Sequence, residues 1–219
     1  MKKITLAAMA LVLLVAGTDS AQAQSFSVGV FGGWNSATLD LSQGVFARAD
    51  NLSGFNAGAV LGWNVSEKFT VDLAGMYTRK GSAVEDQGQP IDLNLDYIEV
   101  PLLARVTIPT QAGDRLSLHF FAGPAVSFET SCKVSADVNG QSVQLDCDDP
   151  QVQAEHHTTD YSLLFGGGVG VGAGPGDIQL DVAYDLGLRN LNNDPSDDSV
   201  IKTRTLMLTA GYRLPIGGW

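Results

Sequence analysis

Basic residues are scarce in this sequence. Its 219 residues include 13 Lys and Arg against 24 Asp and Glu, which gives a net charge of -11. Nucleic-acid binding needs clustered Lys and Arg, and no segment of the chain supplies such a cluster. Charged residues of both signs make up only 17% of the chain, against roughly 25% in an average soluble domain. The composition therefore argues against a nucleic-acid partner, against an ordinary helical enzyme and against a disordered chain.

Long hydrophobic runs are also missing. After residue 23 there is no apolar run of about 18 residues or more, so the chain is not expected to cross a membrane as helices. Before that point, two lysines precede an apolar run over residues 4–15, and residues 21–23 read Ala-Gln-Ala, a form that signal peptidase cleaves. We therefore expect residues 1–23 to be a secretory signal peptide and residues 24–219 to be one exported domain. No Cys follows the apolar run, which excludes a lipoprotein anchor.

The rest of the sequence shows alternation of apolar and polar residues with period two. The alternation is clearest over 55–65 and 178–188, where it predicts β-strands. The connections between the expected strands alternate between long and short along the chain. In an up-and-down meander, this alternation places every long loop at one rim of the barrel and every tight turn at the other. The expected fold is all-β, an eight-stranded antiparallel up-and-down transmembrane β-barrel. The other six expected strands are 26–34, 69–79, 98–108, 116–128, 161–171 and 206–214, with long loops at 35–54, 80–95, 130–160 and 190–202.

The less apolar face of the strands indicates which side encloses the lumen. That face carries residues such as Asn56, Gly58 and Gly62 rather than the Lys, Glu and Thr expected of a surface held in water. The apolar face carries aromatic residues near the strand ends, as the interfacial girdles of membrane barrels do. We therefore expect the apolar face to meet lipid, and the alternative is a soluble lipocalin-like barrel. A barrel of eight strands is narrow enough for its own side chains to fill, so no wide pore is expected.

Two prolines fall within expected strands. Pro101 and Pro124 each lack the N–H that a closed barrel needs at every ladder position. Bulges or luminal water are expected at these two positions.

Three short motifs resemble those of a known family. The segment 96–105, with Tyr97, Glu99 and Pro101, is similar to the Tyr-aliphatic-Glu-aliphatic-Pro-Leu-Leu motif of the PorT-like outer-membrane β-barrel family. Residues 77–81 and 121–124 resemble two further motifs of that family. The resemblance implies an outer-membrane barrel; PorT itself is linked to protein secretion, and nothing in these motifs carries that role across. The C-terminus departs from a usual barrel ending because Pro and Gly residues interrupt the strand before Trp219.

Two cysteines are present, and their spacing predicts a disulfide. Cys132 and Cys147 lie symmetrically around Asn139-Gly140, a strong signal for a two-residue hairpin. In a hairpin of that register the two cysteines face each other, at a separation that a disulfide can span. Export to an oxidising compartment favours the bond, and two free thiols are the alternative.

Several charged residues have the parity of the luminal face. Because an unpaired buried charge costs several kcal/mol, we expect them to form ion pairs. The expected pairs are Asp72 with Arg105 and Asp181 with Arg213. The other inward charges are Glu99, His119, Glu129 and Asp185.

The remaining candidates for chemistry are weak. Adjacent histidines such as His156 and His157 point in opposite directions in an extended chain, and no spacing completes a zinc site. The acidic run 192–198 lacks the ligand spacing of a calcium loop, and the glycine-rich run 166–174 has no G-x-G-x-x-G followed by a helix. No G-x-S-x-G motif is present, and no serine partner for His119 is suggested by spacing. We expect no metal, no cofactor and no catalytic residues.

Two arginines are candidates for contact with lipid. Arg79 and Arg204 have the parity of the lipid face and lie at the rim with the long loops. They are expected to bind outer-leaflet lipid phosphates, and ordinary snorkelling to the interface is the alternative.

The predicted function is structural or interactive. We expect a non-enzymatic protein of the outer membrane of a Gram-negative bacterium, whose partners are membrane lipid, lipopolysaccharide and a possible envelope protein that docks on the long loops. The first alternative is a narrow channel or binding barrel for small apolar or amphipathic compounds. The second is an outer-membrane acyl hydrolase.

Overall fold

The computed structural model describes residues 25–42, 49–86, 89–110, 116–138, 141–147, 149, 157–191 and 200–216. The expected signal peptide, His156, the run 192–198 and Trp219 lie outside the described residues. Among the described residues, no helix is long and apolar enough to cross a membrane.

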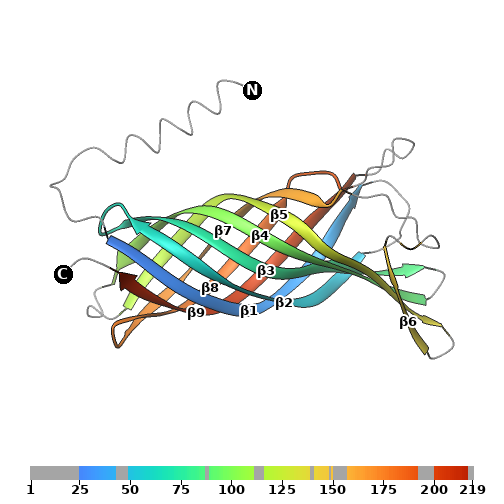
Figure 1. The fold of residues 1–219 in the computed structure, drawn as a ribbon, viewed down its shortest axis with the longest axis horizontal. Coiled ribbons are helices and arrows are strands. Elements are labelled where there is room, and N and C mark those ends of the chain that lie inside the picture. The colour runs from blue at the N-terminus through green and yellow to red at the C-terminus, as the bar shows by residue number, and fades with distance from the viewer. Residues whose placement is uncertain are drawn as a thin grey trace, which may run out of the picture.

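The described residues form one antiparallel sheet that closes on itself (Figure 1). The strand order is β4-β3-β2-β1-β9-β8-β7-β5-β6, and a further pairing of β4 with β5 closes the barrel. All strands except β6 belong to the closed ring, so the predicted eight-stranded barrel is confirmed. The strands are β1 (Ser25–Ser42), β2 (Ala49–Asn64), β3 (Phe69–Asp86), β4 (Gln89–Pro109), β5 (Leu116–Val138), β6 (Gln141–Asp146), β7 (Thr159–Ala173), β8 (Gly176–Gly187) and β9 (Val200–Ile216).

The sequence prediction was wrong about the lengths of the strands at the long-loop end. Strand β6 is a ninth strand that pairs with the end of β5 in the register expected for a hairpin at 139–140, inside the expected loop 130–160. Strands β3 and β4 continue through most of the expected loop 80–95. Backbone hydrogen bonds continue along these extensions. Alternation of apolar and polar residues identifies a strand only where its two faces lie in different environments. The environments of the two faces change once the strands leave the membrane, so the alternation of the barrel does not continue there.

The apolar face of the barrel strands points outward, as predicted. Trp63, Phe120 and Leu180 are 40%, 59% and 52% exposed, whereas Asp72, Glu99 and Asp185 are fully buried inside the barrel. A soluble barrel would show the opposite distribution. The outer surface of the described strands is therefore suited to acyl chains, and the lumen holds the charges.

The two strand prolines interrupt the hydrogen-bond ladder without shifting it. The β3–β4 pairing is interrupted around Pro101, and the β4–β5 pairing is interrupted around Pro124. In both cases the strands pair in the same register before and after the interruption. The bulges expected at these prolines are absent; the register shift in the β4–β5 seam lies between Asp96 and Tyr97. Proline removes a donor but keeps an extended φ, so the ladder loses a bond without inserting a residue.

Beyond the level of Arg79 and Asp96, the strands β3, β4, β5 and β6 form a sheet that extends past the barrel, at the right of Figure 1. We call residues 81–86, 89–95, 131–138 and 141–146 the projecting sheet. In its β4, β5 and β6 strands, the face that continues the lumen carries apolar cross-strand neighbours and the outer face carries polar ones, which reverses the polarity of the barrel; in β3, Ser82 faces Leu93 and Ala83 faces Asp92. Because a lipid-facing surface must be apolar, the projecting sheet lies outside the hydrocarbon layer. The apolar neighbours are Leu93, Val134 and Leu145, and the polar ones are Asp92, Ser135 and Gln144.

Candidate functional site

The lumen contains an ion-paired cluster near the end with the tight turns. Arg105 Nε donates to Asp72 Oδ2 at 2.7 Å, and Arg213 donates to both oxygens of Asp72 at 2.8 Å. The predicted pair of Asp72 with Arg105 is therefore present. We call Asp72, Arg105 and Arg213 the arginine cluster. It also depends on Gly62, where an added Cβ would lie 2.7 Å from Arg213 Nη1 and 2.8 Å from Asp72 Oδ1.

The predicted pair of Asp181 with Arg213 is wrong. In the β8–β9 register, Asp181 faces Thr209, whereas Arg213 faces Asp177. Four residues along a strand correspond to about 13 Å, so Arg213 reaches across the lumen to Asp72 instead. Asp181 instead contacts His119 Nε2 over Gly168 of β7, the strand between them.

An apolar layer fills the middle of the lumen. Its buried members come from six strands of the ring, and Phe31 of β1 packs against them. A cavity of about 70 Å³ lies between this layer and the arginine cluster. The layer consists of Met76, Leu103, Phe121, Leu164, Ala183 and Met207.

A second ion-paired cluster lies on the long-loop side of the apolar layer. Lys80 Nζ lies 2.6 Å from Glu99 Oε2 and also contacts Asp185, and all three side chains are buried. Ser127 Oγ donates to Glu99 at 3.0 Å, and the Lys80 ammonium lies 5.5 Å from the centre of the Tyr97 ring. We call Lys80, Glu99 and Asp185 the lysine cluster. Sequence reasoning missed Lys80 because the expected loop began at residue 80, although its parity matches that of Asp72.

The motif that resembles the PorT-like family supplies the luminal face of β4. Tyr97, Glu99 and Pro101 are alternate residues with buried side chains, and the same face continues to Leu103 and Arg105. One strand therefore contributes to the lysine cluster, the apolar layer and the arginine cluster. In the described part of the chain, these three levels occupy the lumen on the long-loop side of the arginine cluster.

The end of the lumen with the tight turns is hollow. A cavity of about 320 Å³ lies below the arginine cluster, and both arginines line it. We call this cavity the vestibule. Polar side chains from five strands of the ring form its walls: Ser27, Asn64, Thr70, Thr107, Ser117 and His119.

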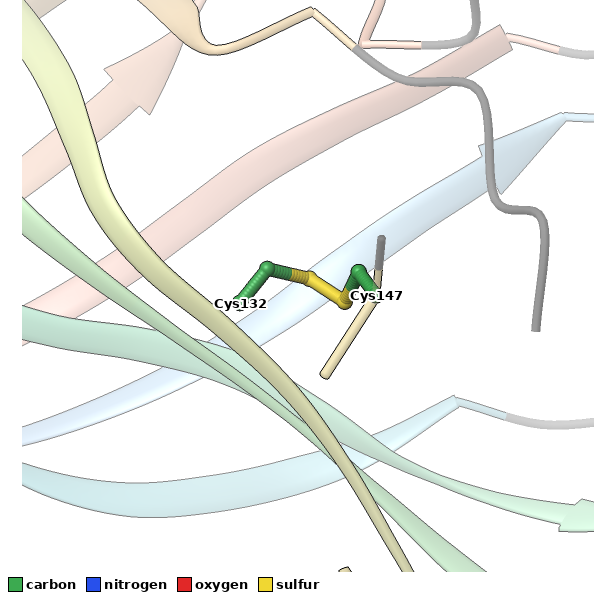
Figure 2. Close-up of a disulfide and its surroundings, with 2 residues drawn as sticks. All are labelled: Cys132 and Cys147. Carbon is green, nitrogen blue, oxygen red and sulfur yellow. A yellow bond between two sulfur atoms is a disulfide. The ribbon is translucent and has the colours of Figure 1, made fainter. Parts of the chain in front are cut away.

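The predicted disulfide is present in the projecting sheet (Figure 2). Cys132 on β5 and Cys147 just after β6 are bonded, with their Cα atoms 5.4 Å apart. Lys133 and Asp146 form the adjacent cross-strand pair. The bond closes the base of the β5–β6 hairpin at the point where it leaves the barrel.

Removing this disulfide is expected to loosen the hairpin and leave the barrel folded. The bond closes a segment with a sequence separation of 15, and a loop of that size corresponds to about 3 kcal/mol of constraint. In a Cys132→Ser/Cys147→Ser variant, tryptic cleavage after Lys133 should therefore become at least about tenfold faster. Cleavage after Lys68, in the turn between β2 and β3, serves as the internal control. Equal cleavage rates at Lys133 in both proteins would show that the bond does not hold the hairpin.

The two rim arginines are held by carboxylates. Arg79 binds both carboxylate oxygens of Asp96 and is 39% exposed, with its guanidinium 5.6 Å from the centre of the Phe55 ring. Arg204 lies 3.1 Å from Asp40 and donates to two backbone carbonyls. Both lie at the long-loop end of the lipid-facing surface.

Groupings suited to metal or nucleophilic chemistry are sparse. In the described segments, no group of three or more His, Cys, Asp or Glu side chains is placed to hold a metal ion. His119 contacts Asp181, and no hydrogen bond joins a described serine hydroxyl to it. This geometry supplies no activated nucleophile at His119.

The sequence matches one model of a known protein family. A family model described as outer membrane protein beta-barrel domain matches residues 21–193, most of the chain. No curated protein matches the sequence.

Solved structures of similar extent share little sequence with this chain. Neisserial surface protein A is 17% identical, with 86% of this chain and 96% of that chain covered and a TM-score of 0.48. Ail of Yersinia pestis is 20% identical, with 86% and 99% covered and a TM-score of 0.43. OprG of Pseudomonas aeruginosa is 10% identical, with 90% and 99% covered and a TM-score of 0.49.

Proposed function

Because the chain belongs to the outer membrane protein beta-barrel domain family, we propose that it is a non-enzymatic barrel that binds other envelope components at its long-loop end. The protein is located in the outer membrane. Within the family, the luminal motif of Tyr97, Glu99 and Pro101 supports a PorT-like member, and we assign it no secretion role.

One contrast within the molecule carries the proposal. The lumen is filled at three levels, whereas the long-loop end is built up into a projecting sheet that a disulfide clamps. A rigid hairpin outside the membrane loses little conformational entropy when it binds a partner. Val143 of β6 is 44% exposed on this hairpin, and β6 is the last strand of the sheet order. We therefore propose that an envelope protein docks on the projecting sheet.

The rim below the projecting sheet suits lipopolysaccharide. Arg79 and Arg204 have a planar guanidinium fork that matches phosphate geometry, and each lies at the long-loop boundary of the apolar surface. The neighbouring aromatic pair of Phe55 and Tyr77, with ring centres 5.3 Å apart, is typical of the interfacial region. We propose that these arginines bind lipid phosphates of the outer leaflet.

Photo-crosslinking in intact cells tests both parts of the proposal. A photoreactive residue is placed at Val143, at Phe55 or, as the control at the opposite rim, at Phe26; all three side chains are 44–49% exposed. Val143 should yield a product with a protein partner, Phe55 a product with lipopolysaccharide, and Phe26 neither. If Val143 and Phe55 give only the products that Phe26 gives, the interactive function is wrong.

The first alternative, a barrel for small apolar compounds, has one observation in its favour. The cavity beside the apolar layer is lined by side chains such as Leu103 and Phe121. Its volume of about 70 Å³ is about half the 150 Å³ of an engineered apolar cavity that binds benzene. We therefore rank this function second, and place the acyl hydrolase below it because no hydrogen bond joins a described serine hydroxyl to His119, whose Nε2 contacts Asp181.

A further inference from the structure

The vestibule has an unusual arrangement of charge. Its inner wall is formed by Arg105 and Arg213 of the arginine cluster, and its lining also includes Glu67 and Asp177. The lining also includes uncharged hydroxyl groups, such as those of Thr107 and Ser117. The cavity therefore has a cationic floor and an acidic mouth, at the end where β1 begins and β9 ends (Figure 1, left).

The two arginines at the inner wall of the vestibule have more hydrogen-bond donors and more positive charge than Asp72 can match. Two guanidinium groups share the single carboxylate of Asp72, so one positive charge remains in excess. Arg105 Nη1 and Arg213 Nε have no hydrogen-bond partner and are themselves buried; the two residues line the cavity with the 7% and 8% of their surface that stays exposed. Unpaired buried donors are costly, and a planar guanidinium with free N–H groups is suited to a carboxylate.

The acidic mouth argues against a simple anion. Asp177 is the Cα partner of Arg213 across the β8–β9 pair, and opposed residues in such a pair lie about 4.5–5.5 Å apart at Cα. Arg213 nevertheless forms its ion pair with Asp72 and not with Asp177. A bare anion on the arginines would therefore lie close to the Asp177 carboxylate, and a bare cation at Asp177 would lie close to Arg213.

We propose that the vestibule binds a small zwitterion of the α-amino acid type. Its carboxylate accepts hydrogen bonds from Arg105 and Arg213, and its ammonium group lies against Asp177. The two charges of an α-amino acid are attached to one carbon, which suits two oppositely charged side chains that face each other across neighbouring strands. The volume of about 320 Å³ corresponds to about ten water molecules at about 30 Å³ each, enough for such a molecule and some of its hydration.

This site is independent of the proposed interactive function. The vestibule lies at the opposite end of the barrel from the projecting sheet, and the three filled levels of the lumen separate them. Failure of the crosslinking experiment would leave the vestibule unaffected, and failure of the vestibule experiment would leave the long-loop function unaffected.

Binding to the whole folded chain in lipid nanodiscs tests the proposal. The probes are alanine, acetate, ethylammonium and dialanine, and the measurement is isothermal titration or the chemical-shift change of vestibule amides. Alanine should bind saturably and at least about tenfold more tightly than acetate or ethylammonium, because it makes both charged contacts and each of the other two probes makes only one. Dialanine separates two sources of the ligand: binding as tight as that of alanine extends the site to peptides, and weaker binding restricts it to free amino acids.

The test variant is Asp177→Asn, which leaves the arginine cluster intact. This variant should bind alanine about tenfold more weakly than the unaltered chain does, and its affinity for acetate should not decrease. Asp146→Asn, the same change at an exposed position of the projecting sheet, should leave both unchanged. The shift in gel mobility on boiling confirms that each variant is folded. No saturable binding of alanine, or equal affinity for alanine and acetate in the unaltered chain, would overturn the proposal.

Discussion

Substitution of Asp72 by Ala is expected to lower the free energy of unfolding of the barrel by about 3–5 kcal/mol. The carboxylate is fully buried and, among the described residues, is the only acidic side chain that forms an ion pair with Arg105 and Arg213. Its removal leaves two guanidinium groups next to each other in a closed lumen, and their desolvation and mutual repulsion are no longer offset. Urea titration of the chain folded into lipid vesicles measures the change.

Asp177→Ala is the matched control for Asp72→Ala. It removes a carboxylate from the same vestibule, but Asp177 is exposed and no ion pair joins it to Arg213. Its effect should remain within about 0.5 kcal/mol, as for most surface substitutions. Equal destabilisation by the two variants would mean that the arginine cluster does not stabilise the barrel.

Substitution of Lys80 by Met is expected to have an effect of similar size at the other ion-paired level. Lys80 is buried between Glu99 and Asp185, and a methionine of similar length leaves two buried carboxylates without a cation. We expect a loss of about 3–5 kcal/mol, measured by the same titration.

A neutral version of the whole lysine cluster separates the loss of charge balance from the loss of packing. In Lys80→Met/Glu99→Gln/Asp185→Asn, the cluster carries no charge because all three replacements are neutral, and Gln and Asn keep the shapes of Glu and Asp. Replacing all members of a buried ionic cluster is often neutral or stabilising, so the triple variant should recover most of the stability that Lys80→Met loses. A triple variant less stable than Lys80→Met would contradict the ion-pair account and assign the effect to packing around Tyr97.

Together these variants test whether the filled lumen is what stabilises the barrel. The two clusters hold six buried charged residues from four strands, and the apolar layer between them contains the large side chains of Phe121 and Leu103. Lipid contributes no hydrophobic driving force between strands whose outer faces are equally apolar. The buried luminal contacts therefore carry much of the specificity of the closed fold.

The sequence alone determined the features that depend on local spacing. Alternation with period two identified the barrel strands and the face that meets lipid, because successive side chains of a strand must point to opposite sides. The spacing of Cys132 and Cys147 around Asn139-Gly140 determined the disulfide for the same reason, since a two-residue turn fixes which residues face each other.

The tertiary structure decided which charges meet across the lumen. Arg213 pairs with Asp72, three strands away around the ring, and Lys80 reaches Asp185 on β8. These contacts depend on the stagger between strands that closure of the barrel imposes, and a single strand's alternation carries no information about it. The same closure leaves the vestibule open below Arg105 and Arg213 and extends β3 to β6 beyond the membrane, where the polarity of the two faces is reversed.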